Sequence, residues 1–258
     1  MDILNYNRKA WNHQVELKNK WTLPVNEQDI VDAQNGKYDL LLTPKKPVPV
    51  NWLGELNGKQ VLCLASGGGQ QVPIFAALGA IVTSFDLSDA QLQQDKETCE
   101  KFGLQVQLVQ GDMADLSALQ NDTFDLIFHP CSNCFSEEIL PVWKECFRVL
   151  KKGGVLLSGF CNPIIYAFDA EKRDEERVLE VKYKLPYSDR DSLDETQRNK
   201  FKEENEPFCY SHSLTTQLGG QLKAGFVLQD LFEDNWGGEE AEDRYFDSFI
   251  ATKSMKPH

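Results

Sequence analysis

Long apolar runs and a basic leader are both missing from this chain. No segment of its 258 residues approaches the apolar length that crosses a bilayer, and residues 1–5 show neither a basic stretch nor an apolar one. We therefore expect a soluble, cytoplasmic protein with no membrane partner. Its seven cysteines, an odd number, are more typical of free buried thiols than of disulfides in such a chain.

Basic residues are also fewer than acidic ones. Lys and Arg total 27 against 40 for Asp and Glu, which gives a formal net charge of −13. An acidic surface repels phosphate backbones, so nucleic acid is not an expected partner. Apolar residues make up 41% of the chain, which is enough to bury the core of one large α/β domain.

From residue 60 onward, short apolar runs alternate with helical patterns. Expected strands are 60–64, 81–85, 105–109, 123–128, 155–160, 226–232 and 244–251, with helices at 88–102, 137–150 and 214–224. This alternation is typical of parallel βαβ units. Residues 1–50 are predicted as a short helix followed by an extended strap. The charged stretch 167–206 is predicted as an insertion, with one short antiparallel pair formed by 180–185 and 207–212.

A glycine-rich turn, Ser66-Gly67-Gly68-Gly69, separates the first of these strands from its helix. Glycines let a backbone approach a ligand closely, and free N–H groups at a helix start favour an anion. A tight strand–helix turn also uses glycine for purely structural reasons. As a dinucleotide fingerprint the turn requires a third small residue at position 72, where the chain has Val72, and this counts against a nicotinamide cofactor.

Acidic residues follow the next two strands. Asp86 ends the second strand, where a carboxylate can accept hydrogen bonds from both hydroxyls of a ribose, although it could instead cap a helix. Asp112 follows the third strand in Gly111-Asp112-Met113, where it could accept from an adenine amine while Met113 packs on the ring. Three turns at one edge of a parallel sheet predict a ligand site, because ligands of open α/β sheets bind there.

The sequences of these turns resemble a known family. Val61–Gly69, Phe85–Ser88 and Gln110–Met113 are similar to the first three motifs of class I methyltransferases that depend on S-adenosylmethionine (SAM). Phe124–Ile127 resembles their fourth strand, and Arg148–Gly154 resembles the RVLKPGG turn of the Methyltransf_11-type group. The resemblance covers about residues 58–160. It implies a Rossmann-like, seven-stranded, mostly parallel sheet in the order 3-2-1-4-5-7-6, with its last strand antiparallel and helices on both faces.

The resemblance also implies which residues hold SAM. They are Ala65, Ser66, Gly67, Gly68 and Gly69 for the methionine part, Asp86 and Leu87 for the ribose, Asp112 and Met113 for the adenine, and Trp11 and His129 near the methyl group. Two positions depart from the family pattern. The chain has Cys63 where the first motif usually carries an acid that helps orient the amino end of the methionine, and Ala65 where it carries glycine. An alanine there costs little if its φ is negative.

The fourth strand ends in His129-Pro130-Cys131-Ser132-Asn133-Cys134, which the resemblance places beside the sulfonium. His129 is a candidate general base for a hydroxyl or thiol acceptor. Alternatively it only hydrogen-bonds the loop or the cofactor, because methyl transfer needs mainly in-line approach and exclusion of water. Cys131 and Cys134 form a C-x-x-C. Since no second C-x-x-C exists, no metal is expected, even with His129 or Cys161 as further ligands.

Candidate acceptor contacts are Asn133, Tyr166, Tyr210 and His212, with Tyr183 and Tyr187 nearby. The expected division is an N-terminal lid and strap (1–57), a SAM-binding core (58–162), an inserted cap on the acceptor side (163–212) and the completion of the core (213–258). The predicted function is SN2 transfer of the SAM methyl group to a small molecule by a monomer or homodimer. A non-catalytic SAM-binding regulator or scaffold is an alternative, and an NAD(P)-dependent oxidoreductase is a weaker one.

Overall fold

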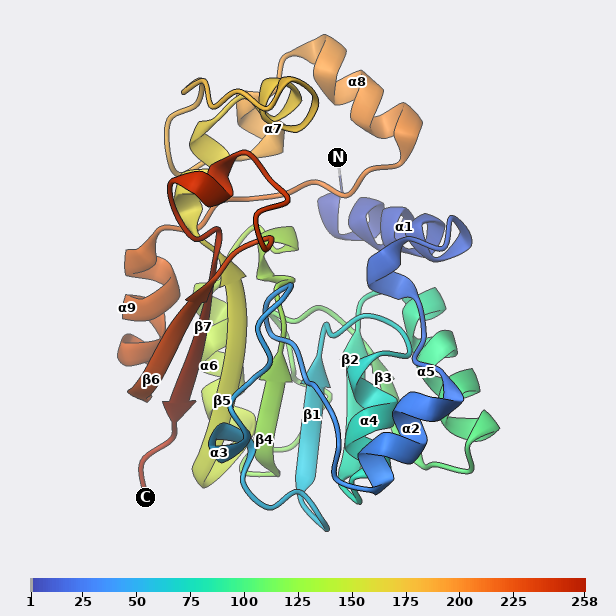
Figure 1. Cartoon of the computed structure of the whole chain (residues 1–258). Helices are drawn as coiled ribbons and strands as arrows, with labels where there is room; N and C mark the ends of the chain where they lie inside the picture. The colour runs from blue at the N-terminus through green and yellow to red at the C-terminus, as the bar shows by residue number, and fades with distance from the viewer. Residues whose placement is uncertain (1) are drawn as a thin grey trace.

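The computed structural model describes residues 2–258 and centres on one seven-stranded sheet (Figure 1). Its order is β3-β2-β1-β4-β5-β7-β6, as predicted. The first five strands pair in parallel, whereas β7 runs antiparallel to both β5 and β6. The strands are β1 Gln60–Leu64, β2 Ile81–Asp86, β3 Val106–Gln110, β4 Phe124–His129, β5 Leu150–Cys161, β6 Val227–Asp234 and β7 Phe249–Met255.

Helices cover both faces of the sheet and its upper edge. They are α1 Ile3–Glu16, α2 Glu27–Gln34, α3 Val50–Leu53, α4 Gln71–Ala77, α5 Asp89–Lys101, α6 Leu140–Val149, α7 Asp189–Ser192, α8 Glu195–Glu204 and α9 Leu214–Ala224. Shorter turns are η1 Lys20–Thr22, η2 Asn133–Phe135, η3 Pro163–Ala167, η4 Lys172–Glu176 and η5 Glu242–Arg244. No helix in residues 2–258 is both long and apolar enough to cross a bilayer.

Two apolar clusters form the core, one on each face of the sheet. On one face, strand residues such as Val61 and Phe128 pack against α2, α3 and α4 and against Cys99 of α5. On the other face, Leu62 and Ile127 pack against α6, where Trp143 is fully buried. Strand residues alternate between the two clusters because successive side chains of a strand point to opposite faces.

Most helix boundaries follow from local signals. Ser88 caps α5 by accepting from the backbone N–H of Gln91, as its position before the acidic first turn predicts. The expected helix 214–224 is confirmed as α9, which ends at Gly225 in the left-handed conformation. The last strand begins at Phe249 and not at residue 244, because the short turn η5 occupies Glu242–Arg244.

Two expectations outside the core were wrong. The segment after the first helix is not all extended, because Asn26 and Asp29 form a capping box that starts α2. The cap also has no antiparallel pair between 180–185 and 207–212. It contains isolated bridges, from Phe168 to Val181 and from Ser188 to Tyr210, and its regular elements are α7 and α8.

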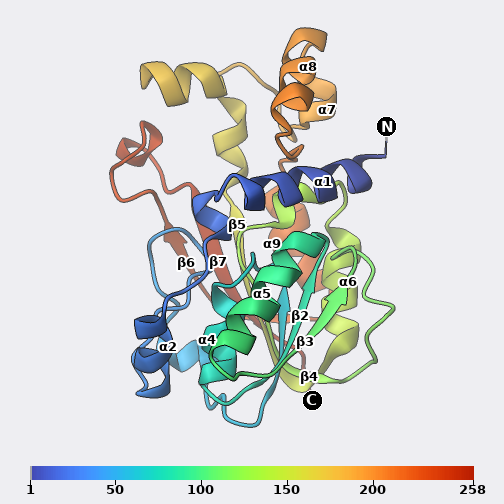
Figure 2. The same cartoon turned by 90° about the vertical axis from the view of Figure 1, so that its right-hand side faces the viewer.

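The cap and α1 lie over the edge where the parallel strands end (Figures 1 and 2). Figure 2 shows α1 crossing this edge between the sheet and the cap helices. The Tyr6 hydroxyl donates to the carbonyls of Phe201 and Glu206, at 3.1 and 3.0 Å. Asn7 donates to the carbonyls of Phe135 and Phe208, at 3.1 and 3.0 Å. These bonds join the first helix to the cap.

Candidate active site

The glycine turn between β1 and α4 has an unusual backbone. Gly67 and Gly69 have φ values of +72° and +80°, which glycine adopts without penalty. Ala65 also lies in the left-handed region, with φ +47°. The condition under which this alanine costs little, a negative φ, is therefore not met, and the alanine carries a steric cost that the usual glycine does not.

Side chains of α5 hold this turn in place. The N–H of Gly68 donates to the side-chain oxygen of Gln91, and the N–H of Gly69 donates to Asp95, each at 2.5 Å. The sequence suggested that these N–H groups are free to bind an anion, which is wrong for Gly68 and Gly69. Gln91 and Asp95 are four residues apart and therefore share one face of α5.

The N-terminal strap packs against the other side of the turn. Val25 donates its backbone N–H to the carbonyl of Gly69 at 2.8 Å. A Cβ atom at Gly67 would lie 2.9 Å from the carbonyl oxygen of Trp21, and one at Gly69 would lie 2.8 Å from Pro24. The turn is thus enclosed between the strap and α5, and glycine is needed for this close approach.

Asp86 ends β2 beside the same turn. Its carboxylate accepts from the N–H of Ser88 at 2.9 Å and also contacts the backbone N–H groups of Leu87 and Gly67. Burial raises the pKa of Asp86 to about 6, while these backbone hydrogen bonds oppose the rise. The partners are N–H groups and not cations, so the carboxylate keeps acceptor capacity for hydroxyl donors.

The third turn lies directly beside Asp86. The N–H of Gly111 donates to the Asp86 carbonyl at 3.0 Å, and strand pairing sets Asp86 opposite Gln110. Asp112 accepts from the N–H of Ala114 at 3.0 Å, which is a local turn contact, and Met113 packs against the core. The structure therefore brings Asp86 and Asp112 to adjacent turns of one sheet edge.

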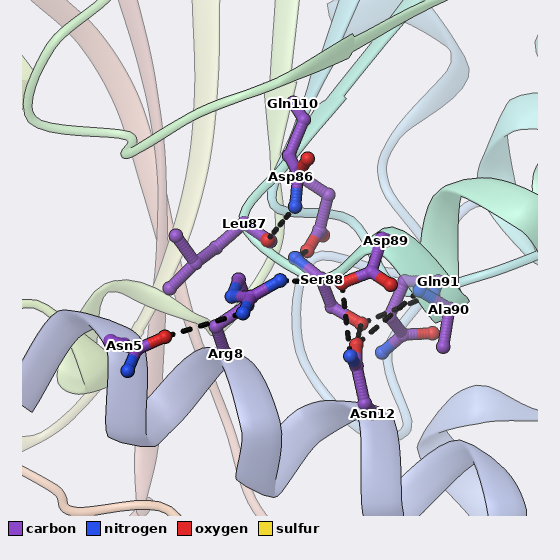
Figure 3. A network of polar contacts seen from close by, with 10 residues as sticks. All are labelled: Asn5, Arg8, Asn12, Asp86, Leu87, Ser88, Asp89, Ala90, Gln91 and Gln110. Carbon is purple, nitrogen blue, oxygen red and sulfur yellow. Dashed lines mark hydrogen bonds and ion pairs between the residues drawn. The ribbon is translucent and has the colours of Figure 1, made fainter.

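Helix α1 is bonded to the loop that follows Asp86 (Figure 3). The Ser88 hydroxyl donates to the side-chain oxygen of Asn12 at 2.7 Å, and the Asn12 amide donates to Asp89 at 2.9 Å. Arg8 forms an ion pair with Asp89 at 3.1 Å. The first helix is therefore fixed to the turn expected to bind the ribose, a contact that the sequence gave no sign of.

Trp11 of the same helix packs edge-on against Phe135 of η2, with ring centroids 4.9 Å apart. It therefore lies over the loop that follows β4. This placement agrees with a lid residue, and it also agrees with an anchor that joins α1 to η2.

His129, the last residue of β4, is fully buried. Its Nδ1 lies 2.9 Å from the Leu64 carbonyl, so Nδ1 carries the proton, while no protein group pairs with its Nε2. Burial lowers the pKa of His129 to about 4. The ring is therefore neutral near pH 7, and its Nδ1–H joins the end of β4 to the end of β1. A pKa of about 4 makes the free Nε2 a weak base, which favours the holding role.

Asn133 is almost completely buried and forms a reciprocal amide pair with Gln217 of α9. Each side-chain amide donates to the oxygen of the other at 3.1 Å. This pair fixes the loop after β4 against α9. The expected contact with cofactor or acceptor stays a prediction, and the geometry favours a structural role.

The three candidate residues of the cap region lie near the ends of β4 and β5. His212 contacts the Ser136 carbonyl at 2.9 Å through its Nε2. Tyr166 stacks on Tyr187 at 5.8 Å. Tyr210 is buried, and no protein group pairs with its hydroxyl. Of the three, Tyr210 alone keeps a buried polar atom available for a ligand.

Four cysteines gather beneath the cap. Cys161, at the end of β5, contacts the thiols of Cys131 and Cys134 and the hydroxyl of Tyr166, and Cys134 also contacts Cys209 of the cap. All are free thiols. The neighbouring thiols of Cys131 and Cys134 hold the pKa of Cys161 below its usual value. As arranged here, no group of three His, Cys, Asp or Glu side chains within residues 2–258 could hold a metal ion. We call Cys131, Cys134, Cys161 and Cys209 the thiol cluster.

Known proteins share this sequence and fold. A protein-family model described as a methyltransferase domain matches residues 62–158. Over 98% of both chains, the protein is 44% identical to YbaJ of Bacillus subtilis, an uncharacterized methyltransferase. The chain belongs to the class I SAM-dependent methyltransferases.

Two further comparisons place this methyltransferase among its relatives. It is 34% identical to an arsenite methyltransferase of Aquipseudomonas alcaligenes, over 50% of its own length and 38% of the relative's. Its fold is similar to that of a SAM-dependent methyltransferase of Mesorhizobium loti, with a TM-score of 0.65 and 18% identity over 80% and 94% of the two chains. At that identity the likeness concerns the fold.

The residues present fit the cofactor of such a methyltransferase. Asp86 offers a partly buried carboxylate whose partners are backbone N–H groups, and ribose hydroxyls are suitable donors for its remaining lone pairs. Bound SAM supplies an electrophilic methyl group on sulfur. Two residues that fix the turn, Gln91 and Asp95, were missed from the sequence, because a spacing of four places them on one face of α5 but does not indicate what that face contacts.

Proposed function

We propose that this methyltransferase transfers the methyl group of SAM to a small molecule that binds under the cap. The observation that carries the proposal is the position of α1 and the cap over the edge where Asp86 and the glycine turn meet (Figure 2). An enclosed site excludes water and holds the acceptor in line with the carbon–sulfur bond. The acidic chain, with a net charge of −13, disfavours nucleic acid as the acceptor.

In this proposal the chain's own groups bind and orient SAM and the acceptor. Asp86 and Leu87 bind the ribose, Asp112 and Met113 bind the adenine, and residues 65–69 bind the methionine part. A lone pair of the acceptor attacks the methyl carbon as the carbon–sulfur bond breaks, and S-adenosylhomocysteine leaves. The acceptor side is formed by Trp11, Tyr210 and the thiol cluster. The cytoplasmic location and the monomeric or homodimeric state stay predictions.

The experiment is conversion of SAM to S-adenosylhomocysteine in the presence of fractionated small-molecule extracts. We expect turnover with at least one fraction, and none with protein or nucleic acid alone. Binding of SAM without conversion in any fraction would favour the non-catalytic regulator. An increase in melting temperature with NAD, but not with SAM, would favour the oxidoreductase.

The role of His129 has its own test. A His129→Gln variant keeps an amide donor for the Leu64 carbonyl but cannot act as a base near neutral pH. Retained turnover, with an unchanged pH profile between pH 6 and 8, would assign His129 to holding the strand ends. Loss of turnover with SAM affinity preserved would assign it to proton removal.

A trivalent arsenical is a second candidate acceptor, which the thiol cluster favours. Thiolates are soft ligands that suit thiophilic ions, and the arsenite methyltransferase is among the relatives. The arsenic lone pair would form the bond to the methyl carbon, and a thiol reductant such as glutathione would return the pentavalent product to the trivalent state. The thiols would have to move closer together, since no three ligands are near enough as arranged here among residues 2–258.

Arsenite with glutathione tests this candidate directly. We expect conversion of SAM in the wild type and its loss in Cys161→Ser, because Cys161 contacts two other thiols of the cluster. Cys146→Ser, a buried cysteine of α6 outside the cluster, is the matched control. No conversion by wild-type protein that binds SAM would exclude the arsenical and leave the small-molecule proposal intact.

A further inference from the structure

Asp95 carries a buried carboxylate that bonds to the glycine turn. It lies on α5, is 2% exposed, and contacts the glycine turn and the middle of β2. One oxygen accepts from the N–H of Gly69 at 2.5 Å, and the other accepts from the Ser84 hydroxyl at 2.6 Å. Neither partner is a cation, so the site bears the cost of burying a carboxylate without an ion pair.

This contact fixes the direction of a peptide group. In a planar trans peptide the N–H and the preceding C=O point in opposite directions. The N–H groups of Gly68 and Gly69 both point to α5, to Gln91 and Asp95 respectively. The carbonyl of Gly67 is therefore directed away from Gln91. Two residues on one face of α5, four positions apart, thus set two successive peptide groups of the turn that faces Asp86.

Asp95 also lies next to Cys63. Burial raises the pKa of the Cys63 thiol, and the nearby charge of Asp95 raises it further. Cys63 is fully buried in β1, one strand from Ser84, which pairs with it in the sheet. A carboxylate at position 63 and the carboxylate of Asp95 would therefore share one buried pocket beneath the glycine turn.

We propose that Asp95 is a positioning residue for the cofactor: it orients the glycine turn for the methionine part of SAM from α5, in the place of an acid at position 63. The inference rests on SAM binding and not on the identity of the acceptor. Asp95 does not touch the cofactor. It acts through the peptide group that joins Gly68 and Gly69.

The test measures SAM affinity by calorimetry in the wild type and four variants. Asp95→Ala removes the acceptor of the Gly69 N–H, and we expect SAM to bind about tenfold more weakly. Asp95→Asn keeps an oxygen acceptor, and its affinity should stay within about threefold of the wild type. Asp95→Ala combined with Cys63→Asp returns a carboxylate to the pocket, and we expect it to recover affinity relative to Asp95→Ala.

Leu92→Ala is the matched control for general destabilisation, because Leu92 is buried on α5 and does not bond to the turn. It should lower the melting temperature without changing SAM affinity. The amide resonance of Gly69, in protein labelled with ¹⁵N-glycine, supplies a second readout. Its proton shift should move upfield in Asp95→Ala and stay near the wild-type value in Asp95→Asn, because the hydrogen bond is lost only in the former.

Unchanged SAM affinity in Asp95→Ala would overturn the proposal, as would an equal loss in Leu92→Ala. An Asp95→Asn variant as weak as Asp95→Ala would also overturn it, because an oxygen acceptor would then not be what the turn requires. Wild-type protein that bound no SAM would instead remove the cofactor assignment itself. The two failures are therefore distinguishable.

Discussion

The side-chain oxygen of Asn12 accepts a hydrogen bond from the Ser88 hydroxyl at 2.7 Å, and its amide donates to Asp89 at 2.9 Å. The same oxygen also accepts from the N–H of Ala90 at 3.3 Å, so one residue of α1 bonds to three successive residues at the start of α5. Because α1 also bonds to the cap through Tyr6 and Asn7, the first helix connects the loop after β2 with the cap.

Removing this connection should loosen the first helix. We expect Asn12→Ala to cost about 1–2 kcal/mol, from three lost side-chain hydrogen bonds that are partly exposed. Hydrogen exchange of the α1 amides should become faster, and SAM should bind more weakly. Lys9→Ala, at an exposed position of the same helix, is the control. Unchanged exchange in Asn12→Ala would mean that packing of Trp11 on Phe135 suffices to hold α1.

Asp86 is predicted to carry much of the ribose affinity. Its removal in Asp86→Ala should weaken SAM binding by about 1–3 kcal/mol, because two buried hydroxyls lose their acceptor. Calorimetry measures the change directly. Asp115→Ala, at an exposed position after β3, should leave the affinity unaltered. Equal affinities of Asp86→Ala and wild type would remove Asp86 from the site.

SAM affinity should also depend on pH. Only the ionised carboxylate accepts from both hydroxyls, and burial raises the pKa of Asp86 to about 6. Affinity should therefore increase from pH 5 to pH 7, with a midpoint near 6. The same titration of Asp86→Asn should show a smaller dependence in this range. A wild-type affinity that is flat across this range would contradict the assignment.

The stability of the cofactor-free protein should change in the opposite direction. Burial raises the pKa values of Asp86 and Asp95 from 3.8 to about 6 and about 7. Between pH 4 and 7 the folded state therefore binds more protons than the unfolded state, so the free energy of unfolding falls as pH rises through that window. Urea unfolding at pH 5 and pH 8 measures the difference. The decrease should be smaller in Asp95→Asn, since that variant has no proton to lose there.

The amide pair of Asn133 and Gln217 should show strong coupling. Asn133→Ala leaves a buried amide of Gln217 unpaired and is expected to lower the free energy of unfolding by about 1–3 kcal/mol. Gln217→Ala should act similarly, and the double variant should cost less than the sum, with a coupling of about 0.5–3 kcal/mol. Additive losses would mean that the two amides act independently.

Much of the fold was predictable because its signals are local. The alternation of apolar runs and helical patterns identified the strands of the core, and Ser88 marked the start of a helix. The sheet order came from the family resemblance. The cap was not predictable in detail because its strand-like pieces lack sheet partners, and Val181 is 72% exposed.

The positions of the candidate site residues were predictable at the level of turns, whereas their hydrogen bonds were not. Asp86 and Asp112 follow strands, so their common edge follows from parallel topology. The roles of Asp95 and Asn12 depend on contacts between segments far apart in the chain, which no local pattern reports. The positive φ of Ala65 was also not predictable, because alanine disfavours the left-handed region and its identity gives no sign of that conformation.

The cap is a single insertion in the chain, between β5 and α9. In the proposed function, the cap residues that meet the acceptor lie in one continuous stretch of the chain, separate from the stretch proposed to bind the cofactor, whereas Trp11, Cys131 and Cys134 lie outside the cap. Such an arrangement lets the two halves diverge at different rates, since a new cap does not disturb the first five strands. The exception is α1, whose residues Tyr6 and Asn7 bond to the segment 201–208. A chimera that exchanged the cap with that of a relative would need the matching first helix as well.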